Sequence, residues 1–585
     1  MLKRMRSFLV LVMLFIAVTM SAQVTTATMS GKVTAQDEPI IVATVVAVHE
    51  PSGTRYGTVT NVSGQFNLQG MRTGGPYKVE ISYVGYQTAI YKGINLSLGE
   101  NYVLNVSLKE SSELLDEIVV TASKNSNMKS DRAGAITNIG EEQMAMIPTV
   151  GRSMNDIMRL TPQGANTGNG FAVGGGNYRQ SSVTVDGAAF SNSFGIGSNL
   201  PGGGSPISLD ALEQIAVSVT PFDVRQSGFI GGAINAVTKS GTNDFYATAY
   251  TYLNNENLNG DKVGDLELIR EKSQKYLYGA SFGGAIIKNK LFFFVNGEYE
   301  DNVTAGPKSR ARLSDSDDWG SNTANVNRPT VGKMDEIRNY FIDKYDYDPG
   351  RYQGYSIKTP AYKIMARLDW NINDNNKLNF RFTRAHSKDN SGPTSSVSPF
   401  YATDIYDGGT AASKGSGNVN HNAAMYFENS RYFKEYNFTS YASEWNSKWL
   451  DGSLNNVTRV TYSFQDEPRS YEGAADFPSI DILEDGAVYA RIGPDIFSPG
   501  NLAQARTFVL TDEMSYTAGI HNLLAGFQFE YNKATNGFQQ AGNGYYVYKS
   551  WDSFVNNEYP KAFAITHSNA ADYSQFKAEM KTLQY

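Results

Sequence analysis

Cysteine is absent from this sequence, and charged residues are scarce for its length. Among 585 residues there is no Cys, and Asp, Glu, Lys and Arg together make up 19%. Without Cys the chain can form neither disulfides nor thiolate metal sites. The net charge of -7 argues against nucleic acid as a partner, because phosphate binding needs a basic surface.

Motifs of enzymes and of resident metals are absent as well. The sequence has no GxSxG nucleophile elbow, and its five histidines are too scattered to form a metal pair. A glycine-rich tract over residues 164–204 has no GxxxxGK[ST] or GxGxxG after a strand, so it does not predict a phosphate loop. We therefore predict that the chain is not an enzyme and that it holds no cofactor.

The N-terminus has the layout of a secretory signal peptide. Residues 1–6 are cationic, residues 8–20 are almost entirely apolar, and the small residues Ser21 and Ala22 follow. We predict a signal peptide over residues 1–22, with a short membrane anchor as the alternative. No later segment approaches the ~20 apolar residues of a membrane-spanning helix. If the exported chain enters a membrane, it must therefore do so as a β-barrel.

Residues 23–109 predict a small β-sandwich. Short runs in which apolar and polar residues alternate are separated by glycine-containing turns, which is typical of sandwiches. The alternating runs cover residues 28–33, 41–48, 77–83 and 102–108. The sequence over residues 57–66 and 79–86 resembles the carboxypeptidase regulatory-like domain. That domain is an accessory module, so the resemblance implies no peptidase activity.

The stretch LLDEIVVTAS, residues 114–123, follows the predicted sandwich. Its β-branched run predicts a strand, but polar residues follow it and no hairpin partner is nearby. We expect an unpaired strand within a linker over residues 110–130, and such a strand invites pairing with another chain. The alternatives are the last strand of the sandwich or a plain linker.

Residues 131–241 predict a small α/β domain. Two helix-like pieces, residues 140–147 and 153–160, are each followed by a proline that ends the helical pattern. Compact strands are predicted over residues 182–187 and 212–219.

Residues 242–585 predict the strands of a large antiparallel transmembrane β-barrel. Alternating segments of about ten residues are joined by short turns on one side and by long polar segments on the other. The predicted strands cover residues 245–252, 276–282, 290–299, 362–370, 377–384, 436–445, 456–464, 508–516 and 523–531. A soluble β-rich adhesin would show the same alternation, but the asymmetry of turns and loops favours the barrel. The predicted fold class is therefore mainly β: a sandwich, a small α/β domain and the first part of a barrel.

The order of these segments resembles that of TonB-dependent outer-membrane transporters, in which the α/β domain is a plug inside the barrel. The plug motifs resemble the Oar-like branch from Bacteroidetes-type bacteria, although residues 221–225 depart from the Arg-Gly-Pro turn of many members. The matching positions are Asp186, Gly187, Gly231, Gly232, Ile234, Asn235, Thr238 and Lys239.

The resemblance implies energised uptake of a large solute, either a peptide or a glycan. TonB, powered by its inner-membrane complex, would pull on a periplasmic strand called the TonB box, which it would bind by β-strand addition. The box is assigned to Asp116, Glu117, Ile118, Val119, Val120, Thr121 and Ala122. The resemblance also places the barrel among outer-membrane lipids, with a surface lipoprotein as a further candidate partner. A cell-surface adhesion or matrix-organising protein on the same scaffold is the alternative function.

Two groups of loop residues are candidates for binding. Asn177, Tyr178 and Arg179 lie in the glycine-rich tract and are candidates for the solute path, although Asn in such loops more often forms turns. Two acidic clusters offer oxygen ligands for Ca²⁺, and solvated loop carboxylates are the alternative interpretation. The clusters are Asp315, Asp317 and Asp318, and Asp343, Asp346 and Asp348.

The number of predicted strands bears on the length of the protein. Barrels that enclose a plug have ~22 strands, whereas about ten are predicted here. We therefore expect these residues to be the first part of a longer chain.

Overall fold

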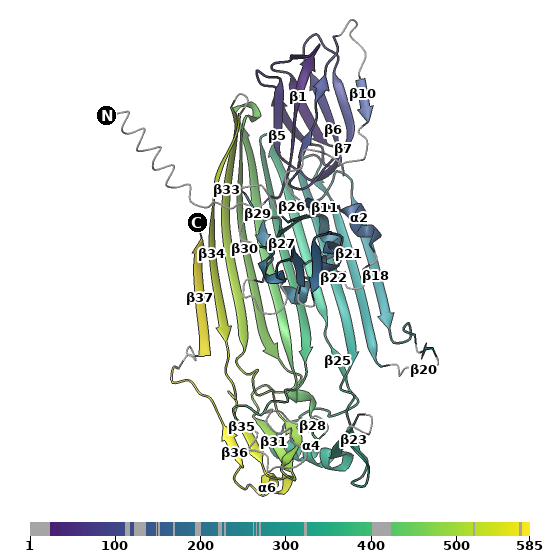
Figure 1. Ribbon diagram of the computed structural model, residues 1–585, viewed down its shortest axis with the longest axis vertical. Helices are drawn as coiled ribbons and strands as arrows, with labels where there is room; N and C mark the ends of the chain where they lie inside the picture. Colours follow the sequence, from purple (N-terminus) through teal and green to yellow (C-terminus); the bar gives the residue numbers. More distant parts are fainter. Residues whose placement is uncertain are drawn as a thin grey trace, which may run out of the picture.

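The computed structural model describes residues 24–110, 118–121, 136–147, 149, 152–167, 170–192, 200–219, 225–226, 230–260, 262–264, 266–267, 271–320, 325–400, 423–518, 521–571 and 576–584. No helix among these residues is long and apolar enough to cross a membrane. Figure 1 shows a small β-sandwich at one end, a tall sheet with a compact domain against it, and a second folded region at the far end.

The sandwich consists of two five-stranded sheets. One sheet contains β1 (Ala27–Ala35), β2 (Glu38–Pro39), β5 (Gln65–Met71), β8 (Asn101–Val103) and β9 (Val106–Ser107). The other has the order β10-β7-β6-β3-β4, with β3 (Thr44–His49), β4 (Thr54–Val59), β6 (Gly74–Ser82), β7 (Ala89–Leu96) and β10 (Ile118–Thr121). Alternate side chains such as Met29, Val45, Phe66 and Tyr77 are buried between the sheets. The prediction of a sandwich is confirmed.

The strand that we expected to be unpaired has a partner. β10 runs parallel to β7, with Ile118 opposite Ala89 and Thr121 opposite Lys92. The expectation is therefore wrong, because the edge of β7 offers backbone groups to a segment that follows the sandwich closely in sequence. β10 is the outermost strand of its sheet, and no strand in the described ranges pairs with its other edge.

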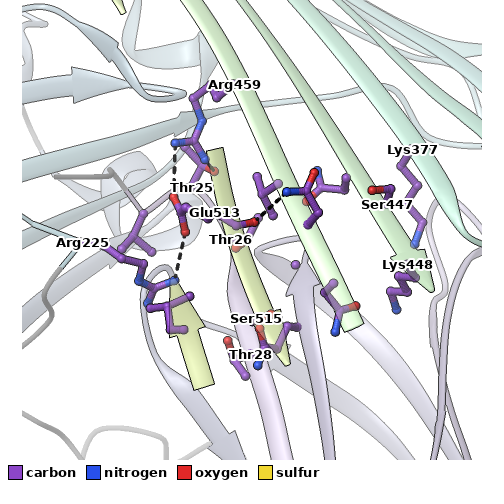
Figure 2. A pocket seen from close by; sticks show the side chains of 18 of the residues that line it. Thr25, Thr26, Thr28, Arg225, Lys377, Ser447, Lys448, Arg459, Glu513 and Ser515 are labelled. Atoms are coloured by element: carbon purple, nitrogen blue, oxygen red, sulfur yellow. Dashed lines mark hydrogen bonds and ion pairs between the residues drawn. The ribbon is translucent and has the colours of Figure 1, made fainter. Parts of the chain in front are cut away.

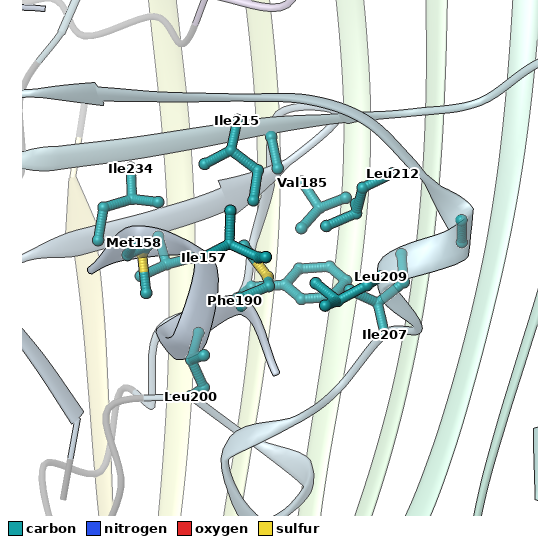
Figure 3. Packing of buried hydrophobic residues seen from close by; sticks show 14 of the residues in the cluster. Ile157, Met158, Val185, Phe190, Leu200, Ile207, Leu209, Leu212, Ile215 and Ile234 are labelled. Atoms are coloured by element: carbon teal, nitrogen blue, oxygen red, sulfur yellow. The ribbon is translucent and has the colours of Figure 1, made fainter. Parts of the chain in front are cut away.

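A central domain, residues 136–241, contains a sheet in the order β11-β16-β17-β14-β15. Its elements are β11 (Ile136–Gly140), α2 (Glu141–Met146), α3 (Met154–Met158), β12 (Gly164–Thr167), β13 (Gly170–Val173), η1 (Tyr178–Gln180), β14 (Ser182–Val185), β15 (Ala188–Ala189), η2 (Gly202–Gly204), η3 (Leu209–Ala211), β16 (Leu212–Ser218) and β17 (Ala233–Thr238). Both helices are shorter than predicted. Figure 3 shows Ile157, Phe190, Leu212 and Ile215 packed together in its apolar core.

Ten strands of the large sheet are antiparallel neighbours in chain order. They are β18 (Tyr246–Asn255), β21 (Ser273–Ile287), β22 (Leu291–Ala305), β26 (Ala361–Asn373), β27 (Asn376–Ser391), β29 (Tyr432–Trp449), β30 (Leu454–Ser470), β33 (Leu502–Ala518), β34 (His521–Gly537) and β37 (Lys577–Gln584). Minor elements beside them are β19 (Lys262–Val263), β20 (Leu266–Glu267), β25 (Ser356–Lys358) and η5 (Leu450–Gly452). All nine predicted strands are present. β37 was not predicted, because its sequence KAEMKTLQ has little apolar alternation.

The two faces of this sheet carry different side chains. Phe294, Met365 and Phe438 point to the central domain and are buried in its core. Their neighbours along the strands, such as Val295 and Ile364, are exposed on the other face. We call these the inner and the outer face. An exposed apolar outer face is what the wall of a membrane barrel presents to lipid.

Long connections at the end opposite the sandwich fold together into a head (Figure 1). Its elements are β23 (Arg310–Arg312), β24 (Val326–Thr330), α4 (Val331–Tyr345), β28 (Met425–Tyr426), η4 (Glu428–Ser430), β31 (Ser479–Glu484), β32 (Ala487–Ile492), β35 (Tyr545–Tyr548), α6 (Trp551–Val555) and β36 (Ala562–Ala564). Phe341, Phe427, Ile480 and Trp551 meet in one core. The sequence did not predict this folded region, in which the apolar residues of each connection pack against those of the others.

A buried ion pair between Arg491 and Asp481 stabilises the head. Arg491 donates from Nε and Nη2 to the Asp481 carboxylate at 2.7 Å, and neither side chain is more than 1% exposed. Asp481→Ala leaves the guanidinium buried without its carboxylate, so we expect a loss of about 3–5 kcal/mol in head stability. Pulse proteolysis in urea measures this loss.

The matched control is the exposed Arg338–Asp348 pair in the same head, 2.7 Å apart. Asp348→Ala should cost less than about 1 kcal/mol, since exposed pairs contribute little. Equal losses from the two variants would show that the buried pair has no special role.

Candidate functional site

The Asp-Gly turn of the central domain touches the wall of the large sheet. Asp186 and Gly187 both have positive φ, 46° and 75°, as the two central residues of a tight type I′ hairpin turn require. A Cβ on Gly187 would lie 2.4 Å from Cδ of Arg459 on β30. Glycine is therefore required here both by the turn and by the closeness of the wall.

The Asp186 carboxylate links the Asp186-Gly187 turn to the segment over residues 231–239. It accepts hydrogen bonds from the Thr238 backbone N at 3.0 Å and from Thr238 Oγ1 at 2.7 Å. The neighbouring strands β14 and β17 are parallel, and Thr184 Oγ1 donates to Asn235 Oδ1 at 2.8 Å. The motif residues that are far apart in sequence thus form one site.

The other motif residues serve packing and pairing. Ile234 is buried in the core of the central domain. A Cβ on Gly232 would lie 2.6 Å from Val173 Cγ1, and one on Gly231 would lie 3.1 Å from the Val173 carbonyl oxygen. Lys239 Nζ pairs with Glu141 of α2 at 2.7 Å.

Arginines of the wall hold Asp186 from the other side. Arg367 on β26 lies 3.4 Å from Asp186 and donates to the Thr238 carbonyl at 2.9 Å. Arg381 on β27 lies 3.6 Å from Asp186 and is 1% exposed. The carboxylate is therefore surrounded by cations on two adjacent strands.

The same chain of charges continues into the sandwich. Arg367 pairs with Asp369 two residues along β26, at 2.9 Å. Arg72, in the turn between β5 and β6, pairs with Asp369 at 3.1 Å, and both side chains are 13% exposed. We call Arg72, Asp369, Arg367 and Asp186 the charge chain. It joins sandwich, wall and central domain.

Further contacts fix the sandwich to the wall. Lys377 Nζ lies 3.7 Å from the centre of the Tyr56 ring and donates to the Arg55 carbonyl at 3.1 Å. Asn371 Nδ2 donates to Thr54 Oγ1 at 3.0 Å. The sandwich is thus attached through several of its turns and strands.

The first described residues of the chain lie in the same interface. Thr25 Oγ1 donates to Glu444 Oε2 at 2.6 Å and accepts from Arg459 Nη2 at 2.6 Å. Figure 2 shows Thr25 and Arg459 beside a cavity of about 40 Å³, where Glu513 lies between Arg459 and Arg225. Charged side chains of the inner face thus bind the segment that precedes β1.

The sandwich also contacts the central domain directly. The Leu98 backbone N donates to Gln214 Oε1 at 2.6 Å, and Leu98 packs with Ala216 and Val237. Asn138 Nδ2 donates to Glu100 Oε1 at 2.8 Å. The sandwich therefore covers this side of the central domain.

Glu213 on β16 lies in this three-part contact. Burial raises the pKa of its carboxyl to about 7, and the nearby Glu141 and Asp369 carboxylates add to the rise. The Arg72 and Arg367 guanidiniums oppose it. Glu213 is therefore a group that titrates near neutral pH where the sandwich meets the central domain.

The candidate solute-path residues lie outside this site. The Asn177 side chain accepts from the Arg179 backbone N at 3.0 Å, and Arg179 Nε donates to Tyr178 OH at 3.1 Å. Asn177 and Arg179 are exposed. Asn177 thus forms a turn, and a role of the three in a solute path stays a prediction.

The acidic loop clusters are engaged by donors of the protein itself. Asp317 accepts from the backbone N of Leu313 and of Ser314. Asp348 pairs with Arg338 through both carboxylate oxygens. Among the residues that the structure describes, no group of acidic and histidine side chains has the arrangement of a metal site.

The predicted TonB box is described only in part. Asp116, Glu117 and Ala122 lie outside the described residues, whereas Ile118, Val119, Val120 and Thr121 form β10. The assignment of the box stays a prediction.

The charged partners of Asp186 were not predicted from the sequence. Arg367 and Asp369 are two residues apart on a predicted strand, so they share one face, and a charged pair on the inner face was a signal that could have been used. Arg72 lies in a turn of another domain, and nothing in the sequence pairs it with Asp369.

Comparison with known proteins divides the chain in the same way. Residues 237–579 match the family described as the outer membrane beta barrel domain, and residues 28–109 match the carboxypeptidase regulatory-like domain. The TonB-dependent transporter Oar of Myxococcus xanthus is 24% identical over 348 residues, covering 55% of this chain and 30% of Oar.

Similar solved structures include a transporter and a receptor. The outer membrane transporter YddB of Escherichia coli is 10% identical to this chain, with a TM-score of 0.49. The match covers 76% of this chain and 53% of YddB. The siderophore receptor PirA of Acinetobacter baumannii is 14% identical, with a TM-score of 0.39. The match covers 70% of this chain and 49% of PirA. The chain therefore spans about half the length of these structures and less than a third of Oar.

The pKa of Glu213 predicts that the contact between sandwich and central domain weakens as pH rises. A carboxyl whose pKa is raised from 4.5 to about 7 in the docked state favours docking fully below pH ~4.5, and this contribution is lost through pH ~7. Spin labels at Glu38→Cys and Asp374→Cys report the distance between sandwich and wall, since no native Cys competes.

We expect the fraction with a long label distance to grow between pH 5 and 8. Glu213→Gln keeps the shape of the side chain without its charge, so the distance distribution should no longer change with pH. The same pH response in Glu213→Gln would exclude Glu213 as its source.

Proposed function

The chain belongs to the outer membrane beta barrel domain family, and on that premise we propose that it takes part in TonB-dependent uptake of a large solute across the outer membrane. The solute class is a peptide or a glycan. The sandwich lies on the periplasmic side, the central domain is the plug, and the head faces the cell exterior. The similarity to the transporter Oar supports this assignment.

The observation that carries the proposal is the position of β10. It is the outermost strand of the sandwich sheet, and in the described ranges only β7 pairs with it. A strand of TonB can add to its other edge through backbone hydrogen bonds, the usual mode of peptide recognition at a sheet edge. TonB would then grip a strand that is itself held by the sandwich.

The contacts of the sandwich determine what such a pull must break. Tension on β10 is carried by its ladder to β7 and so to the whole sandwich. The sandwich is held to the wall by Arg72, and Asp369 and Arg367 continue the charge chain to Asp186 of the plug. We propose that the sandwich leaves the barrel mouth first and that its release removes one partner from the charges that hold the plug.

The head supports the alternative function, adhesion or matrix organisation at the cell surface. It is a folded unit with its own apolar core and buried ion pair, so it presents a defined surface to the exterior. Adhesion through the head would not need TonB, and this separates the two functions experimentally.

A proline in β10 tests the proposed handle. Val119→Pro and Val120→Pro each remove one backbone N–H donor from the strand. We expect the double variant of the full-length protein to lose capture of the periplasmic domain of TonB, and cells carrying it to lose growth on peptide or glycan mixtures that the wild type supports.

The matched control is Val84→Pro, in a sharp turn between β6 and β7. The Tyr86 backbone N donates to the Tyr83 carbonyl, and Gly85 has φ 86°, so position 84 is the site of a type II turn where proline fits. This variant should capture TonB as the wild type does. Capture that survives in the β10 variant would place the handle elsewhere, and a wild type that never binds TonB would favour adhesion.

A further inference from the structure

The strands of one sandwich sheet run from the wall to a free end. At the wall, Thr54 of β4 accepts a hydrogen bond from Asn371 Nδ2 at 3.0 Å. At the other end Thr44 of β3 pairs with Val59 of β4 and with Ser82 of β6. Val59 is five residues along β4 from Thr54, which is about 17 Å of extended strand. Figure 1 shows the sandwich at the end of the molecule opposite the head. We call the free end, around Thr44, Val59 and Ser82, the distal end.

The exposed apolar side chains of the sandwich gather at this distal end. Val84, in the turn after β6, is 92% exposed, and Val62, in the turn between β4 and β5, is 66% exposed. Within residues 24–110 every large apolar side chain that is exposed lies here. We call the set the distal patch, which consists of Ile41, Val42, Val59, Val62, Tyr83 and Val84. A contiguous exposed apolar group of this kind marks an interaction surface.

One residue of the patch has a backbone conformation that valine disfavours. Val42 has φ 62°, in the left-handed region that β-branched residues rarely adopt. Its backbone N donates to the Thr60 carbonyl at 3.0 Å. Thr60 Oγ1 donates to the Ile40 carbonyl at 2.7 Å and accepts from the Ala43 backbone N at 2.8 Å. Backbone hydrogen bonds fix this position, and asparagine would adopt it at lower cost. The exposed valine side chain therefore indicates a role in binding.

Carboxylates border the distal patch. Asp37 and Glu38 are exposed in the hairpin that comes just before it in the chain. On another side Glu110 is exposed where it pairs with Tyr86. Lys109, also exposed, offsets one of these three negative charges. A partner that complements this end would present apolar side chains bordered by Lys or Arg.

The placement of the patch limits what can cover it. Lipid lies against the outer face of the wall, whereas the sandwich is held by inner-face side chains such as Asp369. Two copies in one membrane would point their distal ends in the same direction, so these ends could not face each other. The remaining occupant is a protein of the compartment into which the sandwich points.

The strand β10 begins at the same end of the sandwich. Its Ile118 is opposite Ala89 of β7. Ala89 is in turn opposite Ile81 of β6, close to Tyr83 of the patch. Neighbouring strands are about 4.8 Å apart, so the patch lies about 10–20 Å from β10 across the sheet. A domain of 100 residues has a radius of gyration of about 13 Å. One protein that adds a strand to β10 is therefore large enough to cover the patch as well.

We propose that the distal patch is a second docking surface for the protein that pulls on β10, and that this protein meets it with an apolar face bordered by basic side chains. The inference rests on the proposed function, in which that protein is TonB. The edge of β10 supplies backbone hydrogen bonds, and the patch supplies side-chain contacts that select the partner. Binding at one place raises the effective concentration for binding at the other.

The test measures binding of the periplasmic domain of TonB to the full-length protein in nanodiscs. The patch variant is Ile41→Asn, Val42→Asn, Val62→Asn. We expect its affinity to fall about tenfold or more, as the loss of central interface contacts does. Its thermal stability should equal that of the wild type or exceed it, because asparagine tolerates the backbone of position 42. A fall in stability together with affinity would overturn the proposal, since the patch would then serve the fold.

The matched control makes the same change at exposed apolar residues of the head, Leu313→Asn, Tyr559→Asn and Ile565→Asn. These residues lie at the other end of the molecule, so this variant should bind TonB as the wild type does. An equal loss in the control would overturn the proposal. Val84→Pro keeps an apolar side chain in the patch, so it remains a control for β10.

The acidic border is tested separately through Asp37→Asn, Glu38→Gln, Glu110→Gln. This variant should bind TonB more slowly at low salt, and its association rate should depend less on salt. The control removes charge from exposed head carboxylates, Asp343→Asn, Glu472→Gln and Asp476→Asn, and should keep the wild-type rate. Equal rates in the two variants would exclude a basic border on the partner.

The remaining outcomes separate this surface from the proposed function. Unchanged TonB binding in the patch variant would overturn the docking surface and leave uptake through β10 standing. A wild type that never binds TonB would contradict the proposed function itself. Other occupants are tested before TonB is added, with a fluorophore at Val62→Cys, since no native Cys competes. A label that iodide cannot quench would show that lipid or another segment of this chain already covers the patch, and would also overturn the proposal.

Discussion

A chain of four alternating charges, Arg72, Asp369, Arg367 and Asp186, joins the three parts of this molecule. Each charge is largely removed from water, so its neighbours replace solvent as its partner. Removing one member of such an arrangement leaves an uncompensated buried charge, which costs far more than an exposed pair contributes. The position of the sandwich is therefore coupled to the position of the Asp-Gly turn. The coupling runs through Asp369 and Arg367 on β26.

This coupling gives the sandwich a mechanical role in the proposed uptake cycle. The sandwich covers the central domain through Leu98 and Glu100 and holds the wall through Arg72 and Tyr56. A strand at its edge, β10, is the proposed attachment point for TonB. In the proposed cycle, force applied there would reach the sandwich before the central domain, and the accessory domain would be the first of two barriers. Burial raises the pKa of Glu213 to about 7, and from this we predict that the same contact depends on pH near neutrality.

The sequence predicted the parts of this structure that depend on local pattern. Alternation over about ten residues was enough to find nine wall strands. The resemblance of the Asp-Gly and Gly-Gly motifs to those of a known family pointed to Asp186 and Thr238, which do contact each other. Local sequence pattern did not predict the contacts between distant segments. Arg72 and Asp369 are far apart in the chain, the pairing of β10 with β7 depends on an edge that only the folded sandwich exposes, and the head arises from apolar residues spread over polar connections.

The most direct test of the account is the order in which the parts yield to force. The full-length protein is pulled from a handle at Val120→Cys while the wall is anchored at Asp374→Cys, using the absence of native Cys. The account predicts two ordered steps, release of the sandwich and then extension of the central domain, with Arg72→Ala lowering the force of the first step most. Extension of the central domain before the sandwich leaves the wall, or an unchanged first step in Arg72→Ala, would contradict it.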